Sequence, residues 1–289
     1  MPSLSIIIPT HKRPQILREC LRRLENQTIA KDLEVIVVSD GPDPETAKIF
    51  DVTTPKLLTT HYLEIPKSQQ GVARNHGVDR VTAPLCLFIG DDIFLEPDSC
   101  KKHLEMHQSA VAESRGSPLP GVLGFTTWDP SLKINSVMRW LEATGWQFGY
   151  PQIEQYAHQV LPKEIQHRYS YTSHISLPTE VAKKIRFRED VNLYGWEDIE
   201  WGMRLRDAGV QLFYEPAAKA FHHHPMTLED SLKRMETLGQ SAVRMQQLDP
   251  TFDRIPRGWK KYFYEILAIA PTMRGKHARA FLRGIARVS

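Results

Sequence analysis

The chain has 289 residues, of which 41% are hydrophobic and 25% are charged, as is ordinary for a globular protein. A formal net charge of +3 does not require a nucleic acid as a partner, and we expect none. Three cysteines without metal-binding spacing indicate reduced thiols in a cytoplasmic protein rather than a disulfide-built secreted domain. We expect no signal peptide, and no run approaches the roughly 20 apolar residues of a membrane span.

Strands and helices are predicted to alternate over the first 90 residues. Short β-branched runs that end at Pro or Gly predict strands, and apolar residues at helical spacing predict helices. The predicted strands are 4–8, 33–38, 57–65 and 84–89, and the predicted helices are 14–24, 44–50 and 70–78. This order indicates βαβ units and a mainly parallel sheet flanked by helices, an α/β fold whose ligands bind beyond the carboxyl ends of the strands.

The pattern is less regular in the middle of the chain. Loop residues are predicted at 114–120, strands at 123–128, 171–177 and 211–214, the last followed by a segment 217–224, and helices at 179–185 and 201–208. Aromatic residues gathered between 140 and 156 form either a packed core, which we favour, or a wall that stacks on a sugar. From about Leu228 onward the pattern is helical and basic.

Two neighbouring aspartates follow the strand predicted at 84–89. Asp91 and Asp92 fall at the carboxyl edge of the sheet, as does Asp40 after the strand at 33–38. Mg²⁺ usually takes one or two carboxylates together with phosphate oxygens of a substrate. The pair therefore predicts a cation site, and the alternative is a turn whose aspartates are solvated.

A second acidic pair, Glu197 and Asp198, begins a predicted helix beside Trp196 and Trp201. Apolar surroundings raise the pKa of a carboxyl group, which would suit a general base acting on a hydroxyl. The alternative role is helix capping, because acidic residues are favoured in a first turn, and the two roles are compatible.

Basic and imidazole side chains supply two further candidates. Arg74, at the start of the predicted helix 70–78, can clamp a phosphate, or it is an exposed basic residue. In the run from His222 to His224, consecutive side chains alternate between the faces of a strand, so only one or two of the three can share a site. One histidine joining an aspartate on a cation is the sharper hypothesis, and a surface cluster is the alternative.

Taken together, these segments resemble the family 2 glycosyltransferases, inverting enzymes of the GT-A fold. The resemblance covers roughly residues 3–225 and rests on segments 5–14, 37–41, 70–77, 88–93, 195–198 and the histidines from His222. The chain departs from the family's pattern in two respects, one of which is His174, where Asn is expected. Gly90 stands where the first aspartate of the Asp-x-Asp motif is expected, while the last survives as Asp92.

The resemblance implies an activity and a set of site residues. A sugar would move from a nucleotide-sugar, most simply a UDP-sugar, to a hydroxyl of a carbohydrate, lipid-linked or other acceptor. Asp198 would be the general base, and Glu197 would orient donor or acceptor. Asp92 with His222 or His224 would hold Mg²⁺ or Mn²⁺. The donor would be bound by Pro9, Thr10, Arg13, Asp40, Gly71, Arg74, Asp91 and Trp196.

The resemblance also implies a domain organisation. Residues 1–225 would form the GT-A (Rossmann-like) domain, with a nucleotide-binding half at about 1–95 and an acceptor-binding half at about 96–225. Residues 226–289 would form a helical, basic extension. A nucleotidyltransferase is the rival enzyme, but it is disfavoured because the segment after the first strand has no glycine. The rival from another class is a non-catalytic nucleotide-sugar-binding protein on the same scaffold, which Gly90 would fit.

The tail from Arg257 onward is strongly basic. Residues 257–289 contain eight lysines and arginines against a single acid, Glu265, with apolar residues between them. A basic amphipathic helix can lie on an anionic membrane, which would suit a lipid-linked acceptor. The alternative is a helix packed on the catalytic domain with its basic face in water. We expect a cytoplasmic protein, with peripheral contact at the inner face of the membrane under the first alternative.

Overall fold

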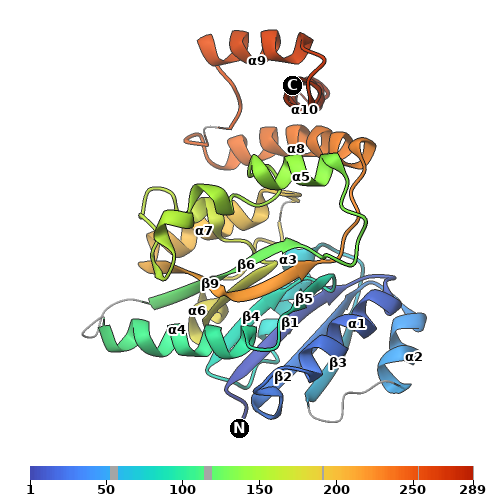
Figure 1. Ribbon diagram of the computed structural model, residues 1–289, viewed down its shortest axis with the longest axis vertical. Helices are drawn as coiled ribbons and strands as arrows, with labels where there is room; N and C mark the ends of the chain where they lie inside the picture. Colours follow the sequence, from blue (N-terminus) through green and yellow to red (C-terminus); the bar gives the residue numbers. More distant parts are fainter. Residues whose placement is uncertain (53–57, 114–118, 191, 253, 289) are drawn as a thin grey trace.

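The computed structural model describes residues 1–52, 58–113, 119–190, 192–252 and 254–288. A curled central sheet is flanked by helices, and a group of C-terminal helices lies at the far end of the molecule from the N-terminus (Figure 1). The strands are β1 (Leu4–Thr10), β2 (Leu33–Asp40), β3 (Thr59–Ile65), β4 (Leu85–Ile89), β5 (Ile93–Leu95), β6 (Leu119–Trp128), β7 (Gln159–Val160), β8 (His174–Pro178) and β9 (Val210–His222). The α/β class predicted from the sequence is confirmed.

The sheet has the order β3-β2-β1-β4-β8-β6-β9-β5, and β7 pairs with β9. The ladders from β3 to β4 are parallel, as is the long ladder between β6 and β9. Strand β8 runs antiparallel between β4 and β6. Strands β5 and β7 pair antiparallel with β9. The sheet is thus mostly parallel, and the antiparallel strand β8 joins the strands β1 to β4 to those that come later in the chain.

Helices cover both faces of the sheet. They are α1 (Pro14–Glu25), α2 (Pro44–Val52), α3 (Gln70–Val78), α4 (Ser99–Glu113), α5 (Ser136–Ala143), α6 (Thr179–Lys184), α7 (Glu197–Asp207), α8 (Leu228–Leu248), α9 (Trp259–Ile269) and α10 (Met273–Ala286). The alternation of side chains along β1 shows how two layers arise. Ile6 and Ile8 pack with Leu17 and Leu21 of α1, while Ile7 packs on the other face with α3.

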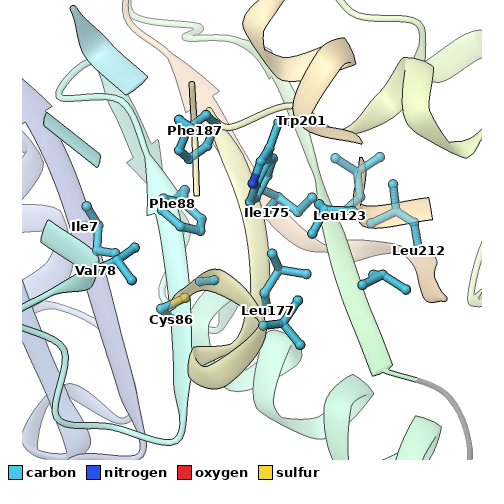
Figure 2. Packing of buried hydrophobic residues seen from close by; sticks show 14 of the residues in the cluster. Ile7, Val78, Cys86, Phe88, Leu123, Ile175, Leu177, Phe187, Trp201 and Leu212 are labelled. Atoms are coloured by element: carbon cyan, nitrogen blue, oxygen red, sulfur yellow. The ribbon is translucent and has the colours of Figure 1, made fainter. Parts of the chain in front are cut away.

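The layer on the Ile7 side is centred on aromatic rings (Figure 2). Phe187 stacks on the fully buried Trp201 with ring centroids 4.4 Å apart, and Phe88 meets both rings edge-on. The indole N–H of Trp201 donates to the carbonyl of Ile185 at 2.7 Å. Burying a side chain of this size stabilises the fold by roughly 2–3 kcal/mol, and this packing fixes α7 against the sheet.

The structure differs from the sequence-based expectations in several elements. Residues 210–222 form one continuous strand, β9, because the parallel ladder with β6 resumes after a register shift between Gly124 and Phe125. Strand β5 and helices α4 and α5 were not predicted. Residue 57, expected to begin a strand, and most of the predicted loop 114–120 lie outside the described residues, and β6 already begins at Leu119. The three cysteines are unpaired and buried.

The aromatic residues between 140 and 156 take part in two packed clusters. Trp140 and Trp146 pack with Trp128 and α5, and Phe148 and Tyr150 join the core on the Ile7 side. The ring of Phe148 also touches His222, with centroids 5.6 Å apart. The favoured interpretation, a packed core, therefore holds for these four residues.

The three C-terminal helices pack closely on one another, with α10 in contact with both α8 and α9. Helix α8 begins with a capping box between Thr227 and Asp230. Helix α10 crosses α8 where Gly239 and Gly284 face the other helix, and a Cβ on either would run into a backbone carbonyl of that helix. Helix α9 packs chiefly on α10. The proposed boundary near residue 225 stays a prediction, although the sheet ends just before it at His222.

Candidate active site

The carboxyl ends of three neighbouring strands bring the first group of site residues together. Thr10, the last residue of β1, is paired with Ser39, one residue before Asp40 at the end of β2. Asp91 follows β4, which pairs with β1 on the other side. The sequence placed these aspartates at one edge of a parallel sheet, and the structure bears out that placement.

Arg13 and Thr10 hold the aspartate pair. The guanidinium of Arg13 donates to Asp91 Oδ1 at 2.7 Å and to Asp92 Oδ2 at 2.8 Å, and the Thr10 hydroxyl donates to Asp91 Oδ2 at 2.8 Å. Burial and the neighbouring charge of Asp92 raise the pKa of Asp91 to about 6. Two carboxylates side by side in a buried place need such partners, so Arg13 and Thr10 keep them in position.

Strand pairing brings two histidines to Asp92. Ile93 of β5 is opposite His222 of β9, and the N–H of His223 donates to the carbonyl of Asp92 at 2.8 Å. Asp92 Oδ2 lies 3.5 Å from His222 Nε2 and 3.3 Å from His224 Nδ1. His223 is turned to the other side, where its Nδ1 lies 2.7 Å from Asp129. His222 and His224 thus share a site, as the alternation of side chains allows.

The cluster of Asp92, His222 and His224 fits a divalent cation. One atom from each residue lies within 4.8 Å of the others. The Nδ1 atom of His222 is buried without a hydrogen-bond partner among the described residues. Burial would raise the pKa of Asp92, but the two histidines and the charge of Arg13 lower it well below its usual range, so this carboxylate is ionised. Carboxylate and imidazole are both ligands of divalent cations, whereas Mg²⁺ prefers oxygen ligands.

Gly90 leaves room for the Asp92 carboxylate. A Cβ at position 90 would lie 2.9 Å from Asp92 Oδ1, closer than real Cβ contacts. Any larger residue here would therefore push the carboxylate away from its present place. The departure from the Asp-x-Asp pattern thus has a local steric consequence that the sequence does not reveal.

Asp40 lies at one end of a cleft of about 270 Å³. Lys67 Nζ donates to Asp40 Oδ2 at 2.7 Å, and the N–H of Ser68 donates to Oδ1 at 2.7 Å. Burial alone would raise the pKa of Asp40, but the hydrogen bonds from Lys67 and Ser68 outweigh it and lower the pKa. The cleft is lined by Asp40, Lys67, Ser68, Gln69, Gln70, Gly71, Arg188, Asn192, Leu193, Tyr194, Glu197 and Glu200. It therefore connects the end of β2 with the start of α7.

Arg74 belongs to α3, and its buried side chain is close enough to the acidic pair Glu197 and Asp198 to interact with their charges. Its side chain lies over the ring of Phe187 and donates to Gln70 Oε1 at 3.2 Å. Its Nε and Nη1 atoms are buried without a hydrogen-bond partner in the described part of the chain. Buried donors without partners are uncommon in native proteins, so these two are available to an anionic ligand.

The acidic pair begins α7, with Asp198 fixed by Thr172. The N–H of Thr172 donates to Asp198 Oδ2 at 3.1 Å, and its hydroxyl donates to Oδ1 at 2.7 Å. Burial and the charge of Asp198 raise the pKa of Glu197 to about 7, and burial also raises the pKa of Asp198 against the charge of Arg74. A carboxylate whose pKa is raised is a stronger base and can accept a proton from a hydroxyl.

Phe148 contacts a residue of the cation-type cluster and a residue next to the support of Asp198. The centroid of its ring lies 5.6 Å from that of His222 and 6.0 Å from that of Tyr171. Tyr171 directly precedes Thr172, which holds Asp198.

The remaining predicted residues are placed as follows. Pro9 precedes Thr10 within β1, opposite Val38. A Cβ on Gly71 would press against Phe187, 3.0 Å from its Cβ. Trp196 is partly buried against α8, and its indole N–H donates to the carbonyl of Leu238 at 2.9 Å. Donor binding by these three residues stays a prediction. Thr172 was missed because nothing local marks it, and only the fold brings it to Asp198.

Comparison with known proteins supports the resemblance seen in the sequence. Residues 5–116 match the family described as Glycosyl transferase family 2. The predicted resemblance to this family is confirmed. The matched residues contain nearly all of β1, the strands β2 to β5, and the aspartate pair Asp91 and Asp92.

Named glycosyltransferases are similar to longer parts of the chain. It is 26% identical over 230 residues to a validoxylamine A glucosyltransferase of Streptomyces hygroscopicus subsp. jinggangensis, a match that covers 73% of this chain and 53% of that protein. The chain spans about half the length of the curated relatives it first matches.

Solved structures share the fold. The mannosyltransferase PcManGT of Pyrobaculum calidifontis, solved with GDP-Man and Mn²⁺, has a TM-score of 0.60 at 15% identity and matches 100% of this chain and 76% of its own. S. aureus TarS 1-349, solved with UDP-GlcNAc, has a TM-score of 0.56 at 16% identity, and the match covers 100% of this chain and 83% of that one. At this identity the likeness establishes the GT-A fold only.

Proposed function

We propose that the protein is an inverting glycosyltransferase that moves a sugar from a UDP-sugar to an acceptor hydroxyl. One observation carries the proposal. A cation-type cluster, Asp92 with His222 and His224, and a carboxyl pair with raised pKa values, Glu197 and Asp198, lie at the carboxyl edge of one sheet. Group transfer from a nucleotide-sugar needs both, because charge must be neutralised on the leaving diphosphate while a proton is removed from the attacking hydroxyl.

The donor would lie across the ends of β1, β2 and β4. Asp40, held by Lys67 and Ser68, would contact the base, and Thr10 and Arg13 would keep the adjoining edge in place. The two unpartnered nitrogen atoms of Arg74 would donate to phosphate oxygens. UDP is favoured because the structural neighbour TarS was solved with UDP-GlcNAc, whereas PcManGT, solved with GDP-Man, makes GDP the alternative.

Asp92, His222 and His224 would hold the divalent cation, for which Mn²⁺ is our choice over Mg²⁺. When bound, the cation supplies Lewis-acid stabilisation to the leaving diphosphate. The protein's own part is to keep Asp92 ionised and directed to the histidines. Gly90 leaves room for the Asp92 carboxylate in this orientation, and Arg13 donates a hydrogen bond to Asp92 Oδ2.

Asp198 would be the base. Thr172 fixes both oxygens of its carboxylate, each of which keeps a lone pair that can take the proton of the acceptor hydroxyl. That hydroxyl would form a bond to the anomeric carbon as the bond to the diphosphate breaks. A single displacement inverts the configuration. Glu197, whose Oε2 has no hydrogen-bond partner within the described residues, would orient a sugar hydroxyl.

The acceptor class is open to a carbohydrate, a lipid-linked sugar or another hydroxyl compound, and the expected cytoplasmic location stays a prediction. A non-catalytic nucleotide-sugar-binding protein is the alternative function. Its sequence support was Gly90, and the position of Asp92 beside that residue gives the glycine a role within a cation site.

Asp198→Asn tests the proposal. The variant keeps the size of the side chain and removes the base, so sugar transfer or donor hydrolysis should fall by about 10²–10⁴-fold while the nucleotide dissociation constant stays the same. Asp207→Asn is the matched control, because Asp207 lies on the same helix and pairs with Arg206 at the surface. Turnover retained in Asp198→Asn would remove Asp198 from the base role. No turnover by the folded wild-type protein with any nucleotide-sugar would favour the non-catalytic alternative.

A further inference from the structure

Helix α9 exposes its large apolar side chains. Trp259, Tyr262, Phe263, Ile266 and Ile269 are each between 57% and 79% exposed. On the other side of the helix, Ala268 is buried, and Tyr264 and Leu267 are half-buried. Figure 1 places α9 at the end of the molecule, beyond α10 and α8. The helix therefore turns its smaller apolar side to the protein and its larger one outward.

The five exposed residues form one stripe, which we call the α9 stripe. Their positions, 259, 262, 263, 266 and 269, recur at the helical period and lie on one side of α9. Single exposed apolar residues are common on proteins, but a continuous patch of this kind marks a site of interaction with another protein or a membrane.

Helix α9 is held in this orientation. Arg279 of α10 donates to the carbonyls of Ala268 at 2.7 Å and Ile269 at 3.3 Å, at the C-terminal end of α9. Gly275 allows α10 to approach so closely that a Cβ there would run into the carbonyls of Leu267 and Ala270. Rolling α9 to bury the stripe would break these contacts. The stripe is thus presented by a helix whose position is set before any partner binds.

The surroundings of the stripe are positively charged. Arg257 precedes α9, and Lys260 and Lys261 lie within it, both exposed. Lys261 is 3.8 Å from Glu265, the sole acid among residues 257–289, which contain eight lysines and arginines. Trp and Tyr with Lys on the flanks is the composition of helices that lie in the boundary between lipid head groups and acyl chains.

We propose that the α9 stripe binds the surface of an anionic lipid bilayer, with Arg257, Lys260 and Lys261 contacting lipid phosphates. The charge decides between this partner and a second copy of the chain. Two copies joined through the stripe would bring two such basic tails together, whereas anionic lipid attracts each of them. The proposal narrows the membrane contact expected for residues 257–289 to α9, because α10 is packed on α8. It stands independently of the proposed function.

Co-sedimentation with vesicles tests the proposal. The full chain should bind vesicles of phosphatidylcholine mixed with phosphatidylglycerol, bind pure phosphatidylcholine more weakly, and lose binding as salt is raised. Phe263→Ser combined with Ile266→Ser should weaken binding about tenfold or more, because two side chains that enter the lipid are lost. Both side chains are exposed, so the variant should fold as the wild type does.

Matched charge variants test whether the lysines of α9, rather than any exposed lysines, attract the protein to anionic vesicles. Lys260→Gln with Lys261→Gln should reduce binding to the anionic vesicles, whereas Lys183→Gln with Lys184→Gln, on the exposed side of α6, should not. If the wild type stays in the supernatant with anionic vesicles, or if the Phe263/Ile266 variant binds as well as the wild type, the proposal is wrong. It is equally overturned if sedimentation velocity shows a dimer that this variant abolishes while no vesicles are bound.

Discussion

Thr172 donates two hydrogen bonds to the carboxylate of Asp198, one from its N–H at 3.1 Å and one from its hydroxyl at 2.7 Å. The two residues are 26 positions apart and come from different elements, the turn before β8 and the first turn of α7. Asp198 therefore has a fixed orientation at the helix N-terminus. The proposed role of Asp198 as the base can therefore be tested by changing Thr172, which leaves the carboxyl group itself in place.

Thr172→Val should lower kcat about tenfold and leave KM for the donor little changed. The substitution keeps the shape and the N–H contact but removes a hydrogen bond to a charged group, worth roughly 1.5 kcal/mol or more. Steady-state kinetics provides the measurement. Thr179→Val is the control, because the hydroxyl of Thr179 donates to the carbonyl of Ala83 far from Asp198. Equal kinetic losses in both variants would indicate a general structural effect instead.

The three consecutive histidines should differ in their effect on Mn²⁺ affinity. His224→Gln removes one of the three groups that surround the cation site, so the dissociation constant for Mn²⁺ in the presence of UDP should rise at least about tenfold. His223→Gln should leave it nearly unchanged, because that ring faces Asp129. Calorimetric titration distinguishes the two. A larger loss in His223→Gln would place the cation elsewhere.

Glu197→Gln should stabilise the protein at alkaline pH. Because burial raises the pKa of Glu197 to about 7, the folded state holds its proton more tightly than the unfolded state does. The associated stability is therefore present below the unfolded pKa, near 4.5, and is lost as the pH rises through 7. Glutamine cannot ionise, so the variant should gain about 3 kcal/mol at pH 8 and little at pH 4.5. Thermal unfolding at both values tests this, and a variant less stable than the wild type at pH 8 would contradict it.

Gly284→Ala should destabilise the protein despite the better helix propensity of alanine. Propensity alone predicts a gain of up to about 1 kcal/mol, since Gly284 lies in the last turn of α10. A Cβ at position 284 would, however, meet the carbonyl of Glu236 on α8, and forcing such helices apart costs roughly 1–3 kcal/mol. Chemical denaturation gives the sign directly. A more stable variant would show that α8 and α10 do not pack this closely.

The sequence predicts the part of the site that depends on strand ends. Asp40 and Asp91 each follow an apolar run, so their common edge could be inferred before the fold was known. The choice among His222, His223 and His224 could not, because it depends on β5, a strand of three residues with no turn signal of its own. Thr172 is brought to Asp198 by tertiary packing alone.

The orientation of α9 shows another limit of sequence reasoning. Its apolar period marks one face of a helix, and such a face is normally the buried one. The sequence cannot tell that Ala268, rather than Phe263, faces α10. That choice comes from Arg279 and Gly275 on the neighbouring helix. In the part of the chain that the structure describes, we find no helix that is both long and apolar enough to pass through a bilayer.

The most direct test of the account is calorimetric binding of UDP, GDP, dTDP and CDP with and without Mn²⁺, in the wild type and in Asp92→Asn. We predict that UDP binds in the presence of Mn²⁺, that its affinity falls at least about tenfold without the metal, and that Asp92→Asn loses this dependence. Binding of no nucleotide by the folded protein, or binding that Mn²⁺ and Asp92 do not affect, would contradict the proposed site.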